Sequence, residues 1–239
     1  MDERPAGHDG VPGAVVAEDD GTGARVTARS RAKADRRAVL LAEAARLFAQ
    51  RGFDGVSMED LGAAAGISGP AIYKHFPGKQ AVLAALLVGA SERLRAGGAA
   101  VVAETPDDDA ALVALVRFHT AFALAQPDVI RVQDRDLDAL AEADRRTVRG
   151  LQRAYVEAWV DVLRRLQPAT PVPELRLRAQ AMFGLLNSTP YSVRGHGGRG
   201  QGGRGQGVRG QGGREVAPER VADLLEEMAL AALGYRAPA

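Results

Sequence analysis

The sequence predicts an all-α protein. Leucine and alanine recur at helical spacing along most of the chain, and stretches in which β-branched residues alternate with polar ones are absent. The 239 residues, 46% of them hydrophobic, are enough for a sizeable core. We expect a three-helix unit over residues 35–81 and a larger helical domain over residues 82–239.

The composition excludes several classes of protein. There are no cysteines, which rules out disulfides, thiolate zinc sites and cysteine nucleophiles. The four histidines lack metal-ligand spacing, so we expect no metal and no cofactor. The net charge is only +1, so any nucleic-acid contact must come from local clusters of basic residues. Without a long apolar run or a signal-peptide pattern, we expect a cytoplasmic protein that does not enter the membrane.

Residues 1–34 are expected to form a disordered arm, because they show no hydrophobic periodicity. Their charge is uneven: an acidic group, Glu18 to Asp20, precedes a basic one. The basic group is Arg25, Arg29, Arg31, Lys33, Arg36 and Arg37. Such an arm either follows DNA phosphates or the minor groove, or serves only as a solubilising tail.

Three short helices are expected next. The first runs from Asp35, its cap, to Arg51, with Gly52 closing it. The second begins at Ser57, which forms a capping box with Asp60. Gly66 supplies a turn with positive φ before the third helix.

Ser68 is expected to cap the third helix, with Pro70 tolerated in its first turn. Ile72 and Phe76 are four residues apart and should face the core. The outward side is then left to Tyr73, Lys74 and His75. Two helices joined by a glycine turn, the second with an exposed polar face, are typical of a helix-turn-helix.

The rest of the chain predicts longer helices. A helix from Lys79 should end or kink at Gly97 and Gly98, and three aspartates should begin the next one. The expected ranges are 79–95, 107–125, 128–137, 140–166, 173–193 and 218–233.

Residues 194–214 repeat an Arg-Gly pentamer that cannot form a core, so we expect a disordered loop. It is either a repeat expansion in a solvent loop or a strand with nonspecific affinity for nucleic acids.

The helix-turn-helix predicts a protein that contacts double-stranded DNA. Tyr73, Lys74 and His75 would contact phosphates, as would Lys79 at a helix N-terminus. Small residues, Ser68 to Ala71, would meet the bases, which favours apolar contact with thymine methyl groups. The complete set of expected DNA contacts is Arg36, Arg37, Ser57, Ser68, Gly69, Pro70, Tyr73, Lys74, His75 and Lys79.

Residues 36–82 resemble the N-terminal domain of the TetR family of bacterial repressors. The matching residues are Leu47-Phe48, Gly52-Phe53, Ser57, Ala63 to Ser68, Ile72 to Phe76, Lys79 and Leu83. The resemblance implies a homodimer, a helical ligand domain and release from DNA by a small molecule. It places Ser57, Ser68, Tyr73, Lys74, His75 and Lys79 at the DNA. Pro70 departs from the small or polar residue that is commoner in the family.

Two segments of the C-terminal half, residues 130–137 and 183–190, are similar to an actinobacterial subgroup of this family. That similarity implies an acyl-CoA or fatty-acyl effector. The expected pocket residues are Phe118, His119, Phe122, Arg131, Trp159, Phe183, Asn187 and Tyr191. For three of these an alternative stays open: His119 and Trp159 as core residues, and Arg131 as half of an internal ion pair. Dimerisation is expected through the helices at 173–193 and 218–233, packed as a four-helix bundle.

Two other functions compete with this interpretation. An enzyme is disfavoured, because neither a nucleophile elbow nor a strand followed by a phosphate-binding glycine loop is present. A nonspecific RNA- or DNA-binding protein that uses the Arg-Gly repeat is the second alternative.

Overall fold

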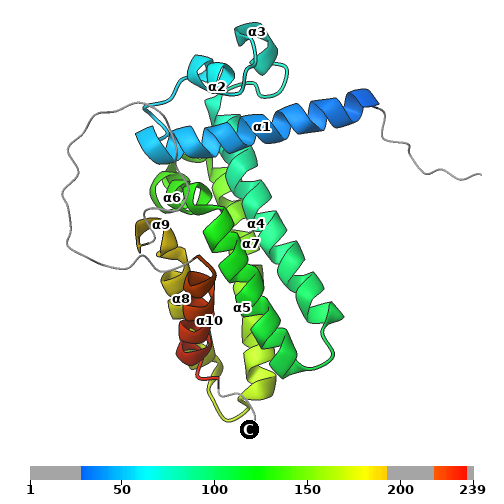
Figure 1. Cartoon of the computed structure of the whole chain (residues 1–239), viewed down its shortest axis with the longest axis vertical. Helices are drawn as coiled ribbons and strands as arrows, with labels where there is room; N and C mark the ends of the chain where they lie inside the picture. The colour runs from blue at the N-terminus through cyan, green and yellow to red at the C-terminus, as the bar shows by residue number, and fades with distance from the viewer. Residues whose placement is uncertain (1–27, 193–217, 236–239) are drawn as a thin grey trace, which may run out of the picture.

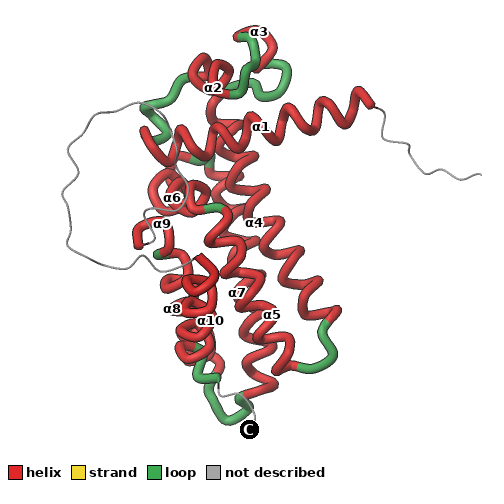
Figure 2. Tube along the Cα trace, in the orientation of Figure 1, coloured by secondary structure: helices red, strands yellow, loops and turns green. Residues whose placement is uncertain are grey.

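The computed structural model describes residues 28–192 and 218–235, and every regular element in these two ranges is a helix (Figures 1 and 2). The fold class is therefore all-α, as predicted. The disorder expected for residues 1–27 and for the Arg-Gly repeat concerns residues outside the described ranges. The helices are α1 (Ala28–Arg51), α2 (Met58–Ala64), α3 (Gly69–Ile72), α4 (Lys79–Glu104), α5 (Asp108–Ala125), α6 (Pro127–Asp136), α7 (Glu142–Leu166), α8 (Val172–Asn187), α9 (Thr189–Ser192) and α10 (Pro218–Ala232), with a 3-10 turn over Leu137–Ala139.

The molecule has a small N-terminal unit placed on one end of a bundle of long helices (Figure 1). Helix α1 crosses the end of α4 and carries α2 and α3 on its outer side, while α6 lies against its inner side. Two hydrophobic cores result. One joins the N-terminal unit to α4, α6 and the start of α7, and the other fills the bundle of α5, α7, α8 and α10.

Helix α1 begins earlier than expected. It starts at Ala28 rather than at Asp35, so Asp35 lies inside the helix and does not cap it. Residues 28–34 are mostly alanine, arginine and lysine, which favour a helix. The expected arm is therefore helical over residues 28–34, and Arg36 and Arg37 stand on an ordered helix.

Helix α4 does not end at Gly97 and Gly98 but continues to Glu104. A Cβ atom on Gly97 would overlap with the Phe118 ring at Cζ, and one on Gly98 would overlap with the Tyr155 ring at Cε2. These glycines are thus positions where two aromatic rings pack against the helix backbone. The predicted end of the helix at Gly97 and Gly98 was wrong, because these glycines allow rings to pack closely against the helix and do not break it.

The remaining helices lie close to their predicted ranges, with one division. Residues 173–193, expected as a single helix, form α8 and the short α9. The interruption lies at Ser188, the C-cap of α8, and Pro190, in the first turn of α9, has no N–H to donate to the carbonyl of Leu186.

Within the described ranges no single helix is long and apolar enough to cross a membrane; α5 followed by residues Pro127–Ala139 would qualify only as a pair bent by 84°.

Candidate nucleic-acid interface and effector pocket

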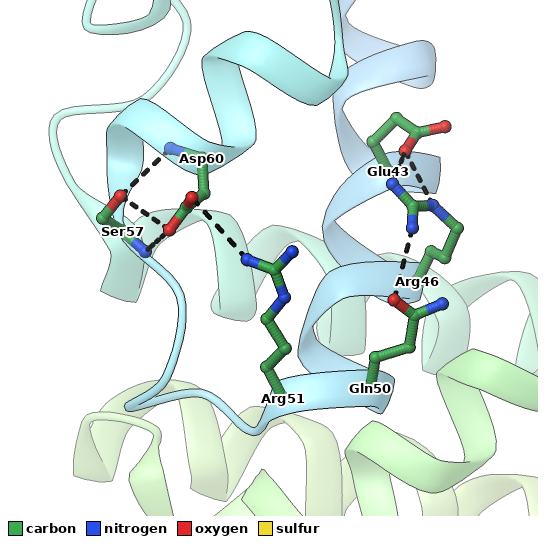
Figure 3. A network of polar contacts seen from close by, with 6 residues as sticks. All are labelled: Glu43, Arg46, Gln50, Arg51, Ser57 and Asp60. Carbon is green, nitrogen blue, oxygen red and sulfur yellow. Dashed lines mark hydrogen bonds and ion pairs between the residues drawn. The ribbon is translucent and has the colours of Figure 1, made fainter. Parts of the chain in front are cut away.

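The start of α2 is fixed by the predicted capping box (Figure 3). The backbone N–H of Asp60 donates to the Ser57 hydroxyl at 3.0 Å, and the backbone N–H of Ser57 donates to the Asp60 carboxylate at 2.9 Å. The hydrogen bonds from Ser57 lower the pKa of Asp60. Arg51, at the end of α1, also lies 3.7 Å from this carboxylate, so the cap joins α1 to α2.

The turn between α2 and α3 depends on two glycines. Gly66 has a φ of 64°, as predicted. Gly62 is needed because a Cβ atom there would lie 2.9 Å from the carbonyl oxygen of Ile67, whose N–H returns to the Gly62 carbonyl. Ser68 occupies the N-cap position of α3, but its side chain makes no capping bond. The exposed Ser68 hydroxyl is therefore free for an external partner.

Helix α3 is shorter than expected: it ends at Ile72, and the residues from Tyr73 to His75 follow it in a turn, yet the predicted inward and outward sides are largely kept. Ile72 and Phe76 are buried, while Tyr73 is 51% exposed and Lys74 is exposed as well. The first turn adds a small exposed surface made of Ser68, Gly69 and Pro70.

His75 differs from its expected place on the outward face, because it is half-buried. Its Nδ1 atom is enclosed and has no hydrogen-bond partner among the described residues. Of the three residues expected on the outward face, Tyr73 and Lys74 are the ones exposed to solvent.

Three basic residues lie around this unit. Arg36 is exposed on α1, and the guanidinium of Arg37 lies 4.8 Å from the centre of the Phe76 ring. The ammonium of Lys79 lies 4.4 Å from the centre of the Phe53 ring and 3.5 Å from the carbonyl oxygen of Asp54. Lys79 therefore holds the loop before α2 against the start of α4.

In the helical domain, an aromatic cluster surrounds His119. The His119 ring centre lies 4.8 Å from that of Phe183, 5.8 Å from Tyr155 and 5.9 Å from Phe122. The structure thus brings together Phe118, His119, Phe122, Trp159, Phe183 and Asn187 from the expected pocket. The rings are in contact, and Trp159 is fully buried, so a ligand here must displace side chains.

The polar contacts of His119 fix its protonation state. Its Nδ1 lies 3.3 Å from the Tyr155 hydroxyl, and its Nε2 lies 3.2 Å from Oδ1 of Asn187. A neutral ring with its proton on Nε2 satisfies both contacts. Burial lowers the pKa of His119 to about 4 and raises that of Tyr155.

Two buried polar atoms of the helical domain are weakly satisfied. Thr120 Oγ1 makes no hydrogen bond with any described residue. Trp159 Nε1 lacks a partner at normal hydrogen-bond geometry, although a contact from Trp159 acts on the Tyr155 hydroxyl and, against the larger effect of burial, lowers the pKa of Tyr155. Unpaired buried polar atoms cost free energy, which makes them natural contacts for an effector.

Arg131 and Tyr191 belong to a different group, between α6 and α9. The Arg131 guanidinium lies 5.9 Å from the centre of the Tyr191 ring and 3.4 Å from the Asp128 carboxylate. The Tyr191 hydroxyl donates to Asp134 at 3.3 Å, and the Tyr191 side chain is 55% exposed.

Sequence reasoning missed two residues, Arg135 and Tyr155. The Arg135 guanidinium donates to the carbonyl oxygens of Phe48 and Ala49 at the end of α1, and it pairs with Asp136 at 3.0 Å. It therefore caps a helix of the N-terminal unit from the helical domain. Tyr155 stands four residues before Trp159, a spacing that could have placed both on one face.

Comparison with known proteins assigns both halves of the chain to one family. Residues 40–86 match the profile of bacterial regulatory proteins of the tetR family, and residues 105–196 match the tetracyclin repressor-like C-terminal domain. The chain belongs to the TetR family. We found no cluster of three metal-ligating side chains within the residues that the structure describes.

Relatives in the TetR family agree with this placement. The HTH-type transcriptional repressor KstR2 of Rhodococcus jostii is 31% identical over 132 residues, which is 55% of this chain and 65% of the relative, just under two thirds. The crystal structure of the TetR regulator PfmR from Thermus thermophilus has a TM-score of 0.63 at 22% identity and covers 83% of this chain and 99% of that one. The crystal structure of AibR in complex with isovaleryl coenzyme A and operator DNA has a TM-score of 0.61 at 18% identity. The match covers 81% of this chain and 97% of AibR. At these identities the two structures establish the fold.

Proposed function

We propose that this protein is a ligand-responsive transcriptional repressor that binds palindromic operator DNA as a homodimer and is released by an acyl-CoA-like effector. The observation that carries the proposal is the α2–α3 unit. A capped helix and a glycine turn present Tyr73 and Lys74 to solvent over buried Ile72 and Phe76, in a chain of the TetR family.

The proposed contacts divide by chemistry. Lys74 and Arg36 supply charge to phosphates, and the Tyr73 hydroxyl donates to a phosphate oxygen. The Ser57 hydroxyl donates to Asp60 at 2.9 Å and would have to leave this bond to do the same. Ser68, Gly69 and Pro70 carry little side-chain bulk, so they allow the backbone to approach the base edges closely. His75 and Lys79 would have to leave their present half-buried contacts to reach DNA.

A dimer is proposed because the helix-turn-helix of one chain can contact only one half of a palindromic operator. Two recognition helices must stand about 34–36 Å apart to enter successive major grooves. The described surface offers an apolar face for this on α8 and α10, where Leu177 is 64% exposed and Met228 is 52% exposed.

The effector is proposed to enter the aromatic cluster around His119. Its acyl chain would replace ring contacts with Phe183 and Phe122, and its carbonyl oxygen would accept from Trp159 Nε1. The isovaleryl coenzyme A bound by AibR motivates the choice of a short acyl thioester.

The DNA-binding part is tested by footprinting the full chain on the region upstream of its own gene. We expect a protected palindrome, and we expect Tyr73→Ala with Lys79→Ala, or Lys74→Ala alone, to weaken binding at least about tenfold. Arg95→Ala, an exposed arginine on α4 far along the chain from this unit, is the control. Unchanged affinity in a folded double variant would refute the proposed interface.

The effector part is tested by a mobility-shift titration of that complex with isovaleryl-CoA, longer acyl-CoA esters and free coenzyme A. Release by an acyl ester but not by coenzyme A is expected, and Phe183→Trp should weaken it by filling the cluster. No release by any thioester would contradict the proposed effector and leave the DNA interface unaffected.

A further inference from the structure

A groove of about 420 Å³ is lined by residues of α1 and α4 and of the start of α6. Helix α6 and most of α4 lie on the side of α1 away from α2 and α3 (Figure 1). Most of its lining consists of small and aliphatic side chains, and Val129 of α6 lines it as well. The residues that we name the floor are Ala38, Leu41, Ala42, Ala45, Ala85 and Leu86. The volume lies in the range of roughly 300–1,000 Å³ that is usual for small-molecule sites.

The polar part of this groove is cationic. Arg37 lines it from α1 and Arg93 from α4, with the Gln126 amide nearby. Both guanidiniums are exposed, and neither has a carboxylate partner among the described residues. Arginine binds carboxylates through two parallel hydrogen bonds, so two arginines that lack a carboxylate partner among the described residues, beside an apolar floor, suit an anion with an apolar body.

We propose that the α1–α4 groove is a second ligand site, one that takes an organic carboxylate with an apolar tail. The tail lies along the alanines of α1 and α4, and the carboxylate is held between Arg37 and Arg93. The site is separate from the aromatic cluster, because the rings of that cluster belong to α5, α7 and α8.

The site is connected to the helix-turn-helix through Arg37. Arg37 lines the groove, and its guanidinium lies 4.8 Å from the centre of the Phe76 ring, which follows α3. A carboxylate that draws Arg37 into the groove removes this cation–π contact, so occupancy loosens the anchoring of the turn after α3.

The test measures binding without DNA and therefore does not depend on the proposed function. Sodium decanoate is titrated into the full chain by calorimetry, with decanol as the neutral analogue. A photoreactive decanoate then locates the site by mass spectrometry of the adducts. We expect decanoate to bind more tightly than decanol, with adducts on α1 and α4.

Two variants are matched with controls. Arg93→Ala should weaken decanoate binding about tenfold, because it removes a charge-assisted hydrogen bond, whereas Arg95→Ala on the same helix should not. Ala42→Met should block the floor, whereas Ala100→Met, at an exposed position on α4, should not.

Three results would overturn the proposal. The first is that the Arg93→Ala and Arg95→Ala variants bind decanoate with equal affinity. The second is that the photoreactive decanoate forms adducts only on α5, α7 and α8. The third is that decanoate binds only after residues 1–27 are removed. The last result would mean that the chain's own N-terminal segment fills the groove.

Discussion

His119 illustrates how single residues in this protein are controlled by burial. The side chain is 2% exposed, and its two ring nitrogens face the Tyr155 hydroxyl and the Asn187 side chain. Because a buried imidazolium would lose its hydration, the neutral form is favoured and the pKa falls to about 4.

This burial predicts a stability that depends on pH. The unfolded chain takes up a proton at His119 near pH 6.5, whereas the folded chain does so only near pH 4, so the free energy of unfolding falls as pH is lowered through this interval. Between pH 7 and pH 5 the loss should be about 2 kcal/mol. Urea denaturation at the two pH values measures it.

The control for His119 is His119→Gln, which keeps a polar side chain that does not titrate. This variant should show a smaller loss between pH 7 and pH 5, because most carboxylates remain ionised there. An equal loss in both proteins would assign the pH dependence to other groups.

At the scale of elements, contacts between helices decide where helices continue and how they are joined. Helix α4 continues past two glycines because rings from α5 and α7 occupy the space that side chains would need. Helix α1 ends against Arg135 of α6, which donates to the Ala49 carbonyl and adds a second donor to the Phe48 carbonyl, already bonded to the N–H of Gly52.

A methyl group at Gly98 should destabilise the protein. Gly98→Ala places Cβ in the space of the buried Tyr155 ring, and we expect a loss of about 1–3 kcal/mol. Gly150→Ala is the matched control in α7, where the nearest atom would be 4.0 Å away, and it should be neutral or slightly stabilising. The midpoints of denaturation measure these stabilities. A Gly98→Ala variant as stable as the wild type would contradict this explanation.

Removing Arg135 should weaken the attachment of α1. Arg135→Ala leaves the Asp136 carboxylate, which is 9% exposed, without its partner and removes a donor from the Ala49 and Phe48 carbonyls, so we expect a loss of about 1–2 kcal/mol. Arg149→Ala breaks only a surface pair with Asp138 and should cost less than about 0.5 kcal/mol. Hydrogen exchange of α1 amides gives the local effect, and equal protection in both variants would rule out the capping role.

At the scale of the whole molecule, the expected assembly depends on the exposed face of α8 and α10. Leu177→Glu places a charge in that face and should convert a dimer into a monomer, with loss of operator affinity. Val39→Glu, at a similarly exposed site on α1, should leave the oligomeric state unchanged. Analytical ultracentrifugation distinguishes the two, and a wild-type monomer or a dimeric Leu177→Glu variant would refute this interface.

Local patterns in the sequence determined the fold class, the helix-turn-helix and the capping box at Ser57. Each depends on residues three to four positions apart or on one glycine, so the information lies within a single segment. Phe118, Trp159 and Phe183, which the sequence predicts for one pocket, lie in one hydrophobic core, and their role in binding an effector stays a prediction.

Only the tertiary structure decided the roles of Gly97, Gly98 and Arg135, and the separation of Tyr191 from the aromatic cluster. The partners of these residues are distant in sequence: Arg135 caps carbonyls 86 and 87 positions earlier in the chain. A glycine that packs against an aromatic ring cannot be distinguished in a sequence from a glycine that ends a helix. The two differ in which atoms occupy the space where a Cβ atom would lie, and those atoms come from other helices.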